Sequence, residues 1–194
     1  MTPPHEEVHF RLPGTSIEAE ITAGSSSFAE KLLDSFFAAG GLVLSQVSSL
    51  TGMEAYSVQN WIKRGFCSPP VNKKYSKSQF CRLVILHMLK DTLTLPEISG
   101  LLSYINGDLT DEGDDTLSDD RLYLYFLRTI LLTEEYTKEK ATSAAAAAIE
   151  DFCEPFPGGK MRLQRTLVTM VCAYHASLLH QEASAMLKEA AKDP

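Results

Sequence analysis

The sequence feature that most constrains the fold is a pair of short helical patterns joined at a glycine, between residues 44 and 65. Apolar side chains recur at helical spacing from residue 44 to 50, and Gly52 then provides the conformational freedom that a tight turn requires. The pattern resumes from about Ala55 to Arg64, with an apolar face around Trp61 and a polar opposite face. Two short helices joined in this way are typical of a helix-turn-helix.

The residues that follow indicate a short basic loop and two further helices. Pro69-Pro70 cannot be helical, and residues 72–75 then combine an asparagine, two lysines and a tyrosine. Residues 76–79 and 94–97 both have the spacing of a capping box, in which the first and fourth residues satisfy each other's backbone N–H groups. The predicted order is therefore helix, turn, helix, short wing, helix, helix.

This order, with particular residues in it, carries a resemblance. The Leu-Thr-Gly turn at 50–52, Arg64-Gly65, Tyr75-Ser76 and the leucine-rich stretch 95–102 are similar to the winged helix-turn-helix of MerR-type bacterial transcription regulators. More closely, Gln59 to Gly65 with the Pro-Pro and Lys-Lys-Tyr residues resembles the uncharacterised YkrK-like bacterial family, a domain of unknown function, over about residues 28–131. The first resemblance implies DNA binding, and the second implies a fold without an activity.

The sequence also predicts which side chains would contact DNA. Gln59 and Asn60 are the candidate base-reading residues, because an amide offers adenine a donor and an acceptor at once. They stand where MerR-type proteins usually have arginine and tyrosine, and the wing is shorter, so neither the operator nor the DNA distortion of that family is implied. The complete candidate set is Tyr56, Ser57, Gln59, Asn60, Lys63, Arg64, Lys73, Lys74 and Tyr75. The alternative is a helix-turn-helix that serves only as a protein-binding scaffold.

The distribution of charge favours a polyanionic partner for this part of the chain. Residues 41–105 contain seven basic and three acidic residues, although the whole chain has a net charge of −7. The acidic residues gather instead in 106–120, which has seven acids and no base and is predicted to be a solvated linker. A calcium loop is the weaker alternative, because the ligand spacing of an EF-hand is absent.

The two ends of the chain give different signals. Residues 1–27 are predicted to form an N-terminal arm, with either a short strand around residues 17–21 or no fixed structure, before a helix at 28–39. Residues 121–194 are predicted to form a helical dimerisation or effector domain. It has an almost wholly apolar helix at 121–132, a helix capped by Thr137, and a long helix from 160 to about 191. The apolar surface of this long helix predicts a homodimer.

Other chemistry has little support in the sequence. Cys172 and His175, with Cys153 as a third ligand, have a spacing that can hold a metal, but without a denser cluster we expect buried, unligated side chains and no metal. No phosphate-binding glycine loop, nucleophile elbow or zinc-protease motif is present, so we expect neither an enzyme nor a cofactor. No apolar run of membrane-spanning length and no secretion signal occur, and the four cysteines are unpaired in spacing, which favours the cytoplasm.

The sequence thus predicts an all-α protein with a winged helix-turn-helix (MerR-like) domain at 28–105, followed by a helical bundle with a long C-terminal helix. The expected function is sequence-specific binding of double-stranded DNA by a homodimeric transcription regulator. Any small-molecule effector would remain unidentified.

Overall fold

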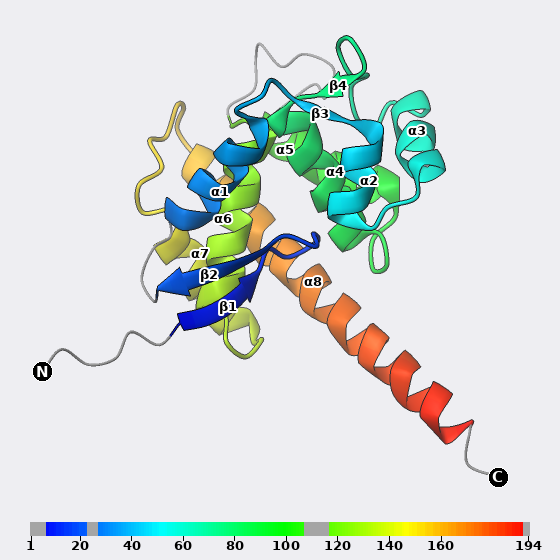
Figure 1. Ribbon diagram of the computed structural model, residues 1–194. Coiled ribbons are helices and arrows are strands. Elements are labelled where there is room, and N and C mark those ends of the chain that lie inside the picture. The colour runs from blue at the N-terminus through cyan, green and yellow to red at the C-terminus, as the bar shows by residue number, and fades with distance from the viewer. Residues whose placement is uncertain (1–6, 23–26, 107–116, 192–194) are drawn as a thin grey trace, which may run out of the picture.

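The computed structural model describes residues 7–22, 27–106 and 117–191, and this part of the chain is mostly helical (Figure 1). It contains eight helices and two small two-stranded sheets. The elements are β1 (Glu7–Arg11), β2 (Glu18–Thr22), α1 (Ser27–Phe37), β3 (Leu42–Val43), α2 (Leu44–Thr51), α3 (Ala55–Lys63), β4 (Lys74–Tyr75), α4 (Lys77–Leu89), α5 (Leu95–Asn106), α6 (Asp119–Leu132), α7 (Lys138–Ala148) and α8 (Gly159–Ala190).

The predicted pair of short helices is present as α2 and α3. Gly52 ends α2 with a φ of 71°, and its N–H donates to the carbonyl oxygen of Ser48 at 2.8 Å. This left-handed conformation is accessible to glycine without strain, which explains why the helix stops there. Gly65, with a φ of 79°, follows the last residues of α3 in the same way.

Both predicted capping boxes are confirmed. The Ser76 hydroxyl accepts a hydrogen bond from the Gln79 N–H at 3.2 Å, and the Gln79 side chain accepts one from the Ser76 N–H at 2.9 Å, at the start of α4. Thr94 and Glu97 make the equivalent pair at the start of α5, with the Thr94 N–H donating to the Glu97 carboxylate at 2.7 Å. These caps satisfy backbone donors that the first helical turn leaves without partners.

The predicted wing, here residues 71–75, is a short hairpin whose second strand pairs with a strand that the sequence did not indicate. Strand β4 lies antiparallel to β3, with Leu42 opposite Tyr75 and Val43 opposite Lys74. Because β3 runs directly into α2, this pairing attaches the wing to the start of that helix. Gly41, at a φ of 95°, lies so close to the backbone of Tyr75 that a Cβ atom would meet its carbonyl oxygen at 2.8 Å.

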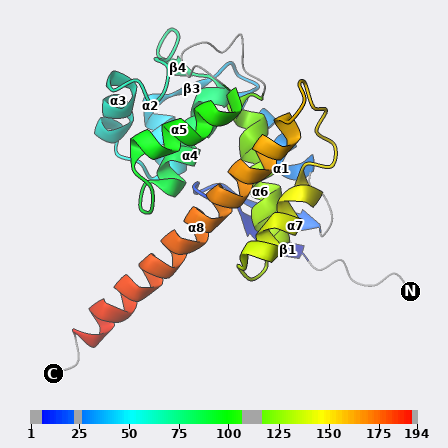
Figure 2. The same ribbon diagram turned by 180° about the vertical axis from the view of Figure 1, so that it is seen from behind.

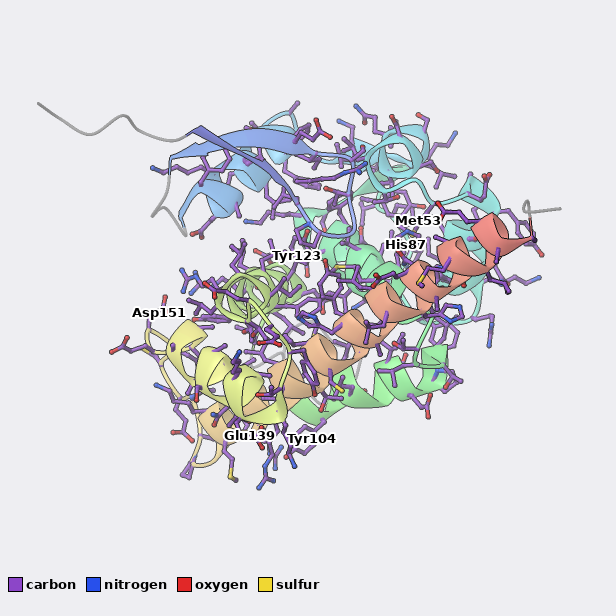
Figure 3. The ribbon with its side chains drawn as sticks, turned by 90° about the horizontal axis from the view of Figure 1, so that it is seen from below. Met53, His87, Tyr104, Tyr123, Glu139 and Asp151 are labelled. Carbon is purple, nitrogen blue, oxygen red and sulfur yellow. The ribbon has the colours of Figure 1, made fainter. Side chains whose placement is uncertain are left out.

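The N-terminal segment is a docked hairpin and not a free arm, as one of the two expectations allowed. Strands β1 and β2 pair from Glu7–Thr22 to Arg11–Glu18, and the loop between them enters the core, where Leu12 and Ile17 are buried. The Tyr123 hydroxyl donates to the Pro13 carbonyl oxygen at 2.7 Å, an approach of α6 to this loop that can be followed in Figure 3. The sequence did not indicate this docking, because Leu12 and Ile17 are buried against helices that are distant in sequence.

The acidic stretch at 106–120 is only partly described, because residues 107–116, which include most of the predicted linker and of the calcium alternative, lie outside the described residues. Its last two acids are paired with basic residues of the molecule. Asp119 is buried in an ion pair with Arg82, and Asp120 pairs with Lys77 at 3.1 Å. These two carboxylates begin α6, where the positive end of the helix dipole favours them.

The helices on either side of this stretch share one core. Helix α6 is buried along most of its length, as predicted, and packs against α4, α7 and α8. The core joins buried side chains from the β1–β2 loop through to Ala173 on α8. The two predicted domains, residues 28–105 and 121–194, therefore bury apolar side chains in a common core.

Helix α8 extends far beyond this core. It has 32 residues, which corresponds to about 48 Å, and both ribbon views show its second half projecting away from the other helices (Figures 1 and 2). Ser177 is the last buried residue on it, and large apolar side chains beyond that point are exposed. None of the helices in the described ranges combines the length and hydropathy needed to cross a membrane.

Candidate nucleic-acid interface

The outer face of α3 presents most of the residues that the sequence singled out. Tyr56 is 77% exposed, Gln59 and Lys63 are exposed, and Asn60 is partly exposed. The inner face carries Val58 and Trp61, which are buried in the core. Trp61 is therefore a packing residue and not a stacking platform. The helix is held by its apolar face, so its polar face is free to meet a partner.

Ser57 and Arg64 occupy the two ends of the same helix. Ser57 lies in the first turn and is partly exposed. The guanidinium carbon of Arg64 lies 4.8 Å from the ring centroid of Phe66, a cation–π contact that orients the side chain at the C-terminal end of α3. Because Arg64 is exposed, guanidinium N–H donors remain available to a partner in solution.

The cations of this region divide into two groups. Lys77, Arg82 and Lys90 pair with carboxylates within the molecule. The other four make no ion pair with any described residue, and all four lie on α3 or the wing: Lys63, Arg64, Lys73 and Lys74. Among the cations of residues 41–105, those that make no ion pair with a described carboxylate are thus the ones that the sequence assigned to DNA. Figure 1 shows α3 and β4 at the same end of the molecule.

The wing places its two lysines outward and its tyrosine inward. Lys73 and Lys74 are exposed, whereas Tyr75 is only 3% exposed and belongs to the core. Burial raises the pKa of the Tyr75 phenol, and the neighbouring Cys67 adds to the effect. Tyr75 anchors the wing, because a strand alternates its side chains between the two faces and this side chain takes the inner one. Its contact with DNA stays a prediction, and its burial leaves little of the side chain for such a contact.

Two consecutive residues at the wing tip have left-handed backbones. Asn72 has a φ of 51° and Lys73 a φ of 63°, and the Lys74 N–H closes the turn on the Val71 carbonyl oxygen at 2.9 Å. Positive φ at both central residues matches the tight hairpin turn in which Asn-Gly is the preferred pair. Val71, next to them, is 72% exposed. Val71 and Asn72 were not among the predicted site residues, although Asn72 was placed in the basic loop and asparagine is a recognised turn residue.

A groove separates α3 from the wing. It has a volume of about 630 Å³ and runs between the side chains of the helix and those of the loop that leads to the wing. Its lining residues are Val43, Leu44, Ser45, Gln59, Ile62, Lys63, Pro70, Lys73 and Tyr75. A lysine on each wall and apolar groups between them give this groove an amphipathic character.

The residues considered for a metal lie on and beside α8. Cys172 and Cys153 are both exposed, in contrast to the expected burial, and His175 is half-buried against Tyr136, with ring centroids 5.4 Å apart. Burial lowers the pKa of His175. No group of three or more potential ligands comes together within the described ranges.

Comparisons with known proteins bear on the same part of the chain. Residues 36–126 match a family model described as a domain of unknown function, DUF1836. The chain is also 30% identical, over 79 residues, to the uncharacterized protein YkrK of Bacillus subtilis (strain 168). This similarity covers 39% of the chain and 34% of the length of that relative. These findings support the resemblance to YkrK-like proteins, and no solved structure matches the chain.

Proposed function

We propose that the protein binds double-stranded DNA in a sequence-specific way and acts in the cytoplasm as a transcription regulator. In this proposal α2, α3 and the wing are a winged helix-turn-helix of MerR-like type, with α3 as the recognition helix. The observation that carries the proposal is the gathering of four unpaired cations, Lys63, Arg64, Lys73 and Lys74, around the exposed polar face of α3. A protein that is acidic overall but gathers basic residues on one helix and the adjoining hairpin is suited to a polyanion that approaches this surface.

The roles of the side chains follow from their positions. Gln59 and Asn60 lie mid-helix on the outer side, where an amide reaches the edge of adenine in the major groove. Lys63 and Lys73 border the groove between helix and wing, so they would contact phosphates, which set the register without reading sequence. Tyr56 at the start of α3 would meet a phosphate or a thymine methyl group.

The experiment is selection of bound sequences from a random duplex pool at two salt concentrations. We expect a recovered motif, and binding to it should weaken steeply with salt because phosphate contacts release counterions. The double variant Gln59→Ala, Asn60→Ala should lose about 1–3 kcal/mol of discrimination for each lost base contact, with the fold intact. Gln181→Ala, an exposed amide on α8, is the matched control and should leave the motif unchanged.

A pool from which no motif is recovered would refute sequence-specific binding. The scaffold alternative would then gain weight, since the same exposed helix face and the projecting α8 would serve protein partners. Under that alternative the Gln59 and Asn60 changes affect no DNA preference. They would instead weaken a protein complex.

We further propose that the protein is a homodimer joined through α8. From Cys172 to its end, one face of α8 carries exposed residues spaced alternately by four and three, which is the heptad spacing of a coiled coil: Cys172, Ala176, Leu179, Ala183, Met186 and Ala190. Ala173 and Ser177, which face the body, are buried, and the stripe from Ala176 onward lies on the opposite side of the helix, whereas Cys172 at its start lies beside Tyr136. Leu179 and Met186 are 66% and 63% exposed in the single chain, and a second copy would cover them.

Small and large residues alternate along the stripe. If two α8 helices lie antiparallel with Leu179 opposite Ala183 of the other copy, Met186 falls opposite Ala176, and Cys172 opposite Ala190. The Leu179 and Met186 layers then each combine a small and a large side chain, which fills space better than pairing alike residues. Sedimentation equilibrium at micromolar concentration should give twice the monomer mass, and Leu179→Glu with Met186→Glu should give a monomer. Gln181→Glu, off the stripe, should leave the dimer intact.

A further inference from the structure

The wing tip has features that phosphate contact alone does not explain. Val71 exposes most of its apolar side chain at the tip, next to Asn72 and Lys73 in left-handed conformations. A non-glycine residue in this region costs about 1–3 kcal/mol, although asparagine tolerates it better than lysine. The Lys73 side chain is exposed and makes no ion pair within the described chain, so it returns no evident stability to the fold.

The groove between α3 and the wing suggests what this tip does. Gln59, Ile62 and Lys63 line it from the helix, and Pro70 and Lys73 line it from the wing loop. A sugar–phosphate strand has the same character, with an apolar deoxyribose between charged phosphates. This strand is also the ridge that separates the major groove of a duplex from the minor groove.

We propose that the groove holds one sugar–phosphate strand, and that the wing tip lies in the minor groove beyond it, where Val71 and Asn72 read base pairs. This inference rests on the proposed DNA binding and adds a second reading site to it. Lys63 and Lys73 contact phosphates of the enclosed strand from its two sides. The deoxyribose packs on Ile62 and Pro70, which explains an apolar groove in a basic surface.

The chemistry of the minor groove defines the preferred sequence. An A·T pair shows only acceptors there, whereas a G·C pair adds the amino group of guanine. The amide of Asn72 donates to the acceptors of A·T. The apolar Val71 side chain leaves the guanine amino group without a hydrogen-bond partner. The wing therefore selects A·T pairs beside the segment that α3 reads.

Inosine separates a minor-groove reader from a major-groove reader. An I·C pair resembles A·T in the minor groove, because it lacks the amino group, but resembles G·C in the major groove. The measurement is the affinity of the full-length protein for its selected duplex with the flanking A·T pairs changed to G·C or to I·C. We expect about a 5- to 150-fold loss with G·C, the usual range for one wrong base pair, and retention of affinity with I·C.

A wing variant links this preference to the named residues. Val71→Ser with Asn72→Gly keeps a backbone that accepts a positive φ, and both side chains lie outside the core, so the fold should be unaffected. The variant should bind the three duplexes equally well while still requiring the motif read by α3. If I·C behaves as G·C does, or if the variant keeps the A·T preference, the inference is wrong although DNA binding stands. If the wild type binds no duplex specifically, both proposals fail.

Lys73→Gly gives an independent test. Glycine relieves the left-handed strain, so the free energy of unfolding should stay the same or rise. Removing one phosphate contact should weaken DNA binding and reduce the slope of log affinity against log salt by about 1. If Lys73 served only the turn, Lys73→Gly would not lower DNA affinity while keeping stability. Unchanged DNA affinity in this variant would overturn the role given to Lys73.

Discussion

Arg82 on α4 and Asp119 at the start of α6 form a buried two-point ion pair. The distance from Nε to Oδ2 is 2.6 Å and that from Nη2 to Oδ1 is 3.3 Å, and the side chains are only 6% and 7% exposed. The planar guanidinium matches the carboxylate in this geometry, which fixes α6 against α4 in orientation as well as in distance. The pair joins residues 37 positions apart in the chain, and both lie within the region that matches DUF1836.

Breaking this pair on one side should be costly. Asp119→Ala leaves the Arg82 charge buried without its carboxylate partner, and we expect a loss of about 3–5 kcal/mol in the free energy of unfolding, measured by urea denaturation. Asp91→Ala removes the exposed Lys90–Asp91 pair and should cost less than about 1 kcal/mol. The double change Arg82→Met, Asp119→Leu should recover much of the loss. Equal losses of stability in Asp119→Ala and Asp91→Ala would contradict the larger contribution expected of the buried pair.

The docking of the N-terminal hairpin can be tested at one glycine. Gly14 has a φ of 75°, and a Cβ atom there would lie 2.6 Å from Cγ of Met88 and 2.7 Å from Cγ1 of Val84. Gly14→Ala should therefore destabilise the fold through both backbone strain and overlap, by about 2–4 kcal/mol in all. Gly52→Ala is the matched control. It has a similar φ of 71° but open space around it, so it should show the backbone cost alone, near 1 kcal/mol.

The two half-buried histidines predict a fall in stability on mild acidification. Burial lowers the pKa of His87, an effect to which Lys90 adds and which Asp91 opposes, and burial also lowers that of His175. The unfolded chain, with histidine near pKa 6.5, then binds protons more readily than the folded one. Stability should stay level above about pH 6.5 and decrease as the pH falls toward the folded-state pKa values.

Urea denaturation between pH 7.5 and 5.5 measures how the free energy of unfolding changes with pH. This range lies above the pH at which most carboxylates titrate. His87→Gln should flatten this pH dependence. His180→Gln, at an exposed position on α8, should not. An identical slope in His87→Gln would show that this imidazole titrates alike in both states.

The antiparallel arrangement of α8 can be tested with a single disulfide. With Cys153 changed to serine, Ala190→Cys should form a covalent dimer on mild oxidation, because its thiol faces Cys172 of the second copy. The Cys153→Ser protein without that change should remain uncrosslinked. A parallel pair would instead place the two Cys172 side chains together and crosslink the latter protein. That result would contradict the proposed arrangement.

Local signals made much of the fold predictable. Both capping boxes, the glycine stops after α2 and α3, the Thr137 cap of α7 and the length of α8 depend on residues within a few positions of each other, so the sequence alone shows them. Long-range burial was not predictable in the same way. Leu12 and Ile17 enter the core against helices far along the chain, and Asp119 leaves the acidic stretch to meet Arg82.

The candidate site divides along the same line. The outer face of α3 follows from helical periodicity, so Tyr56, Gln59 and Lys63 were placed correctly on the surface. The wing depends on the pairing of β4 with β3, two-residue strands with no periodicity to detect, so the inward direction of Tyr75 was missed. The exposed Val71 was missed for the same reason.

The pairing of β3 with β4 has a consequence for the energetics of recognition. The wing is hydrogen-bonded to the residues that lead into α2, its turn is closed by the Lys74 N–H, and Tyr75 fixes its base in the core. A loop tied down at these points gives up little conformational entropy when it meets a partner. The favourable free energy of its contacts with a partner is therefore not offset by the cost of ordering a flexible segment. A small contact surface can then discriminate strongly between partners.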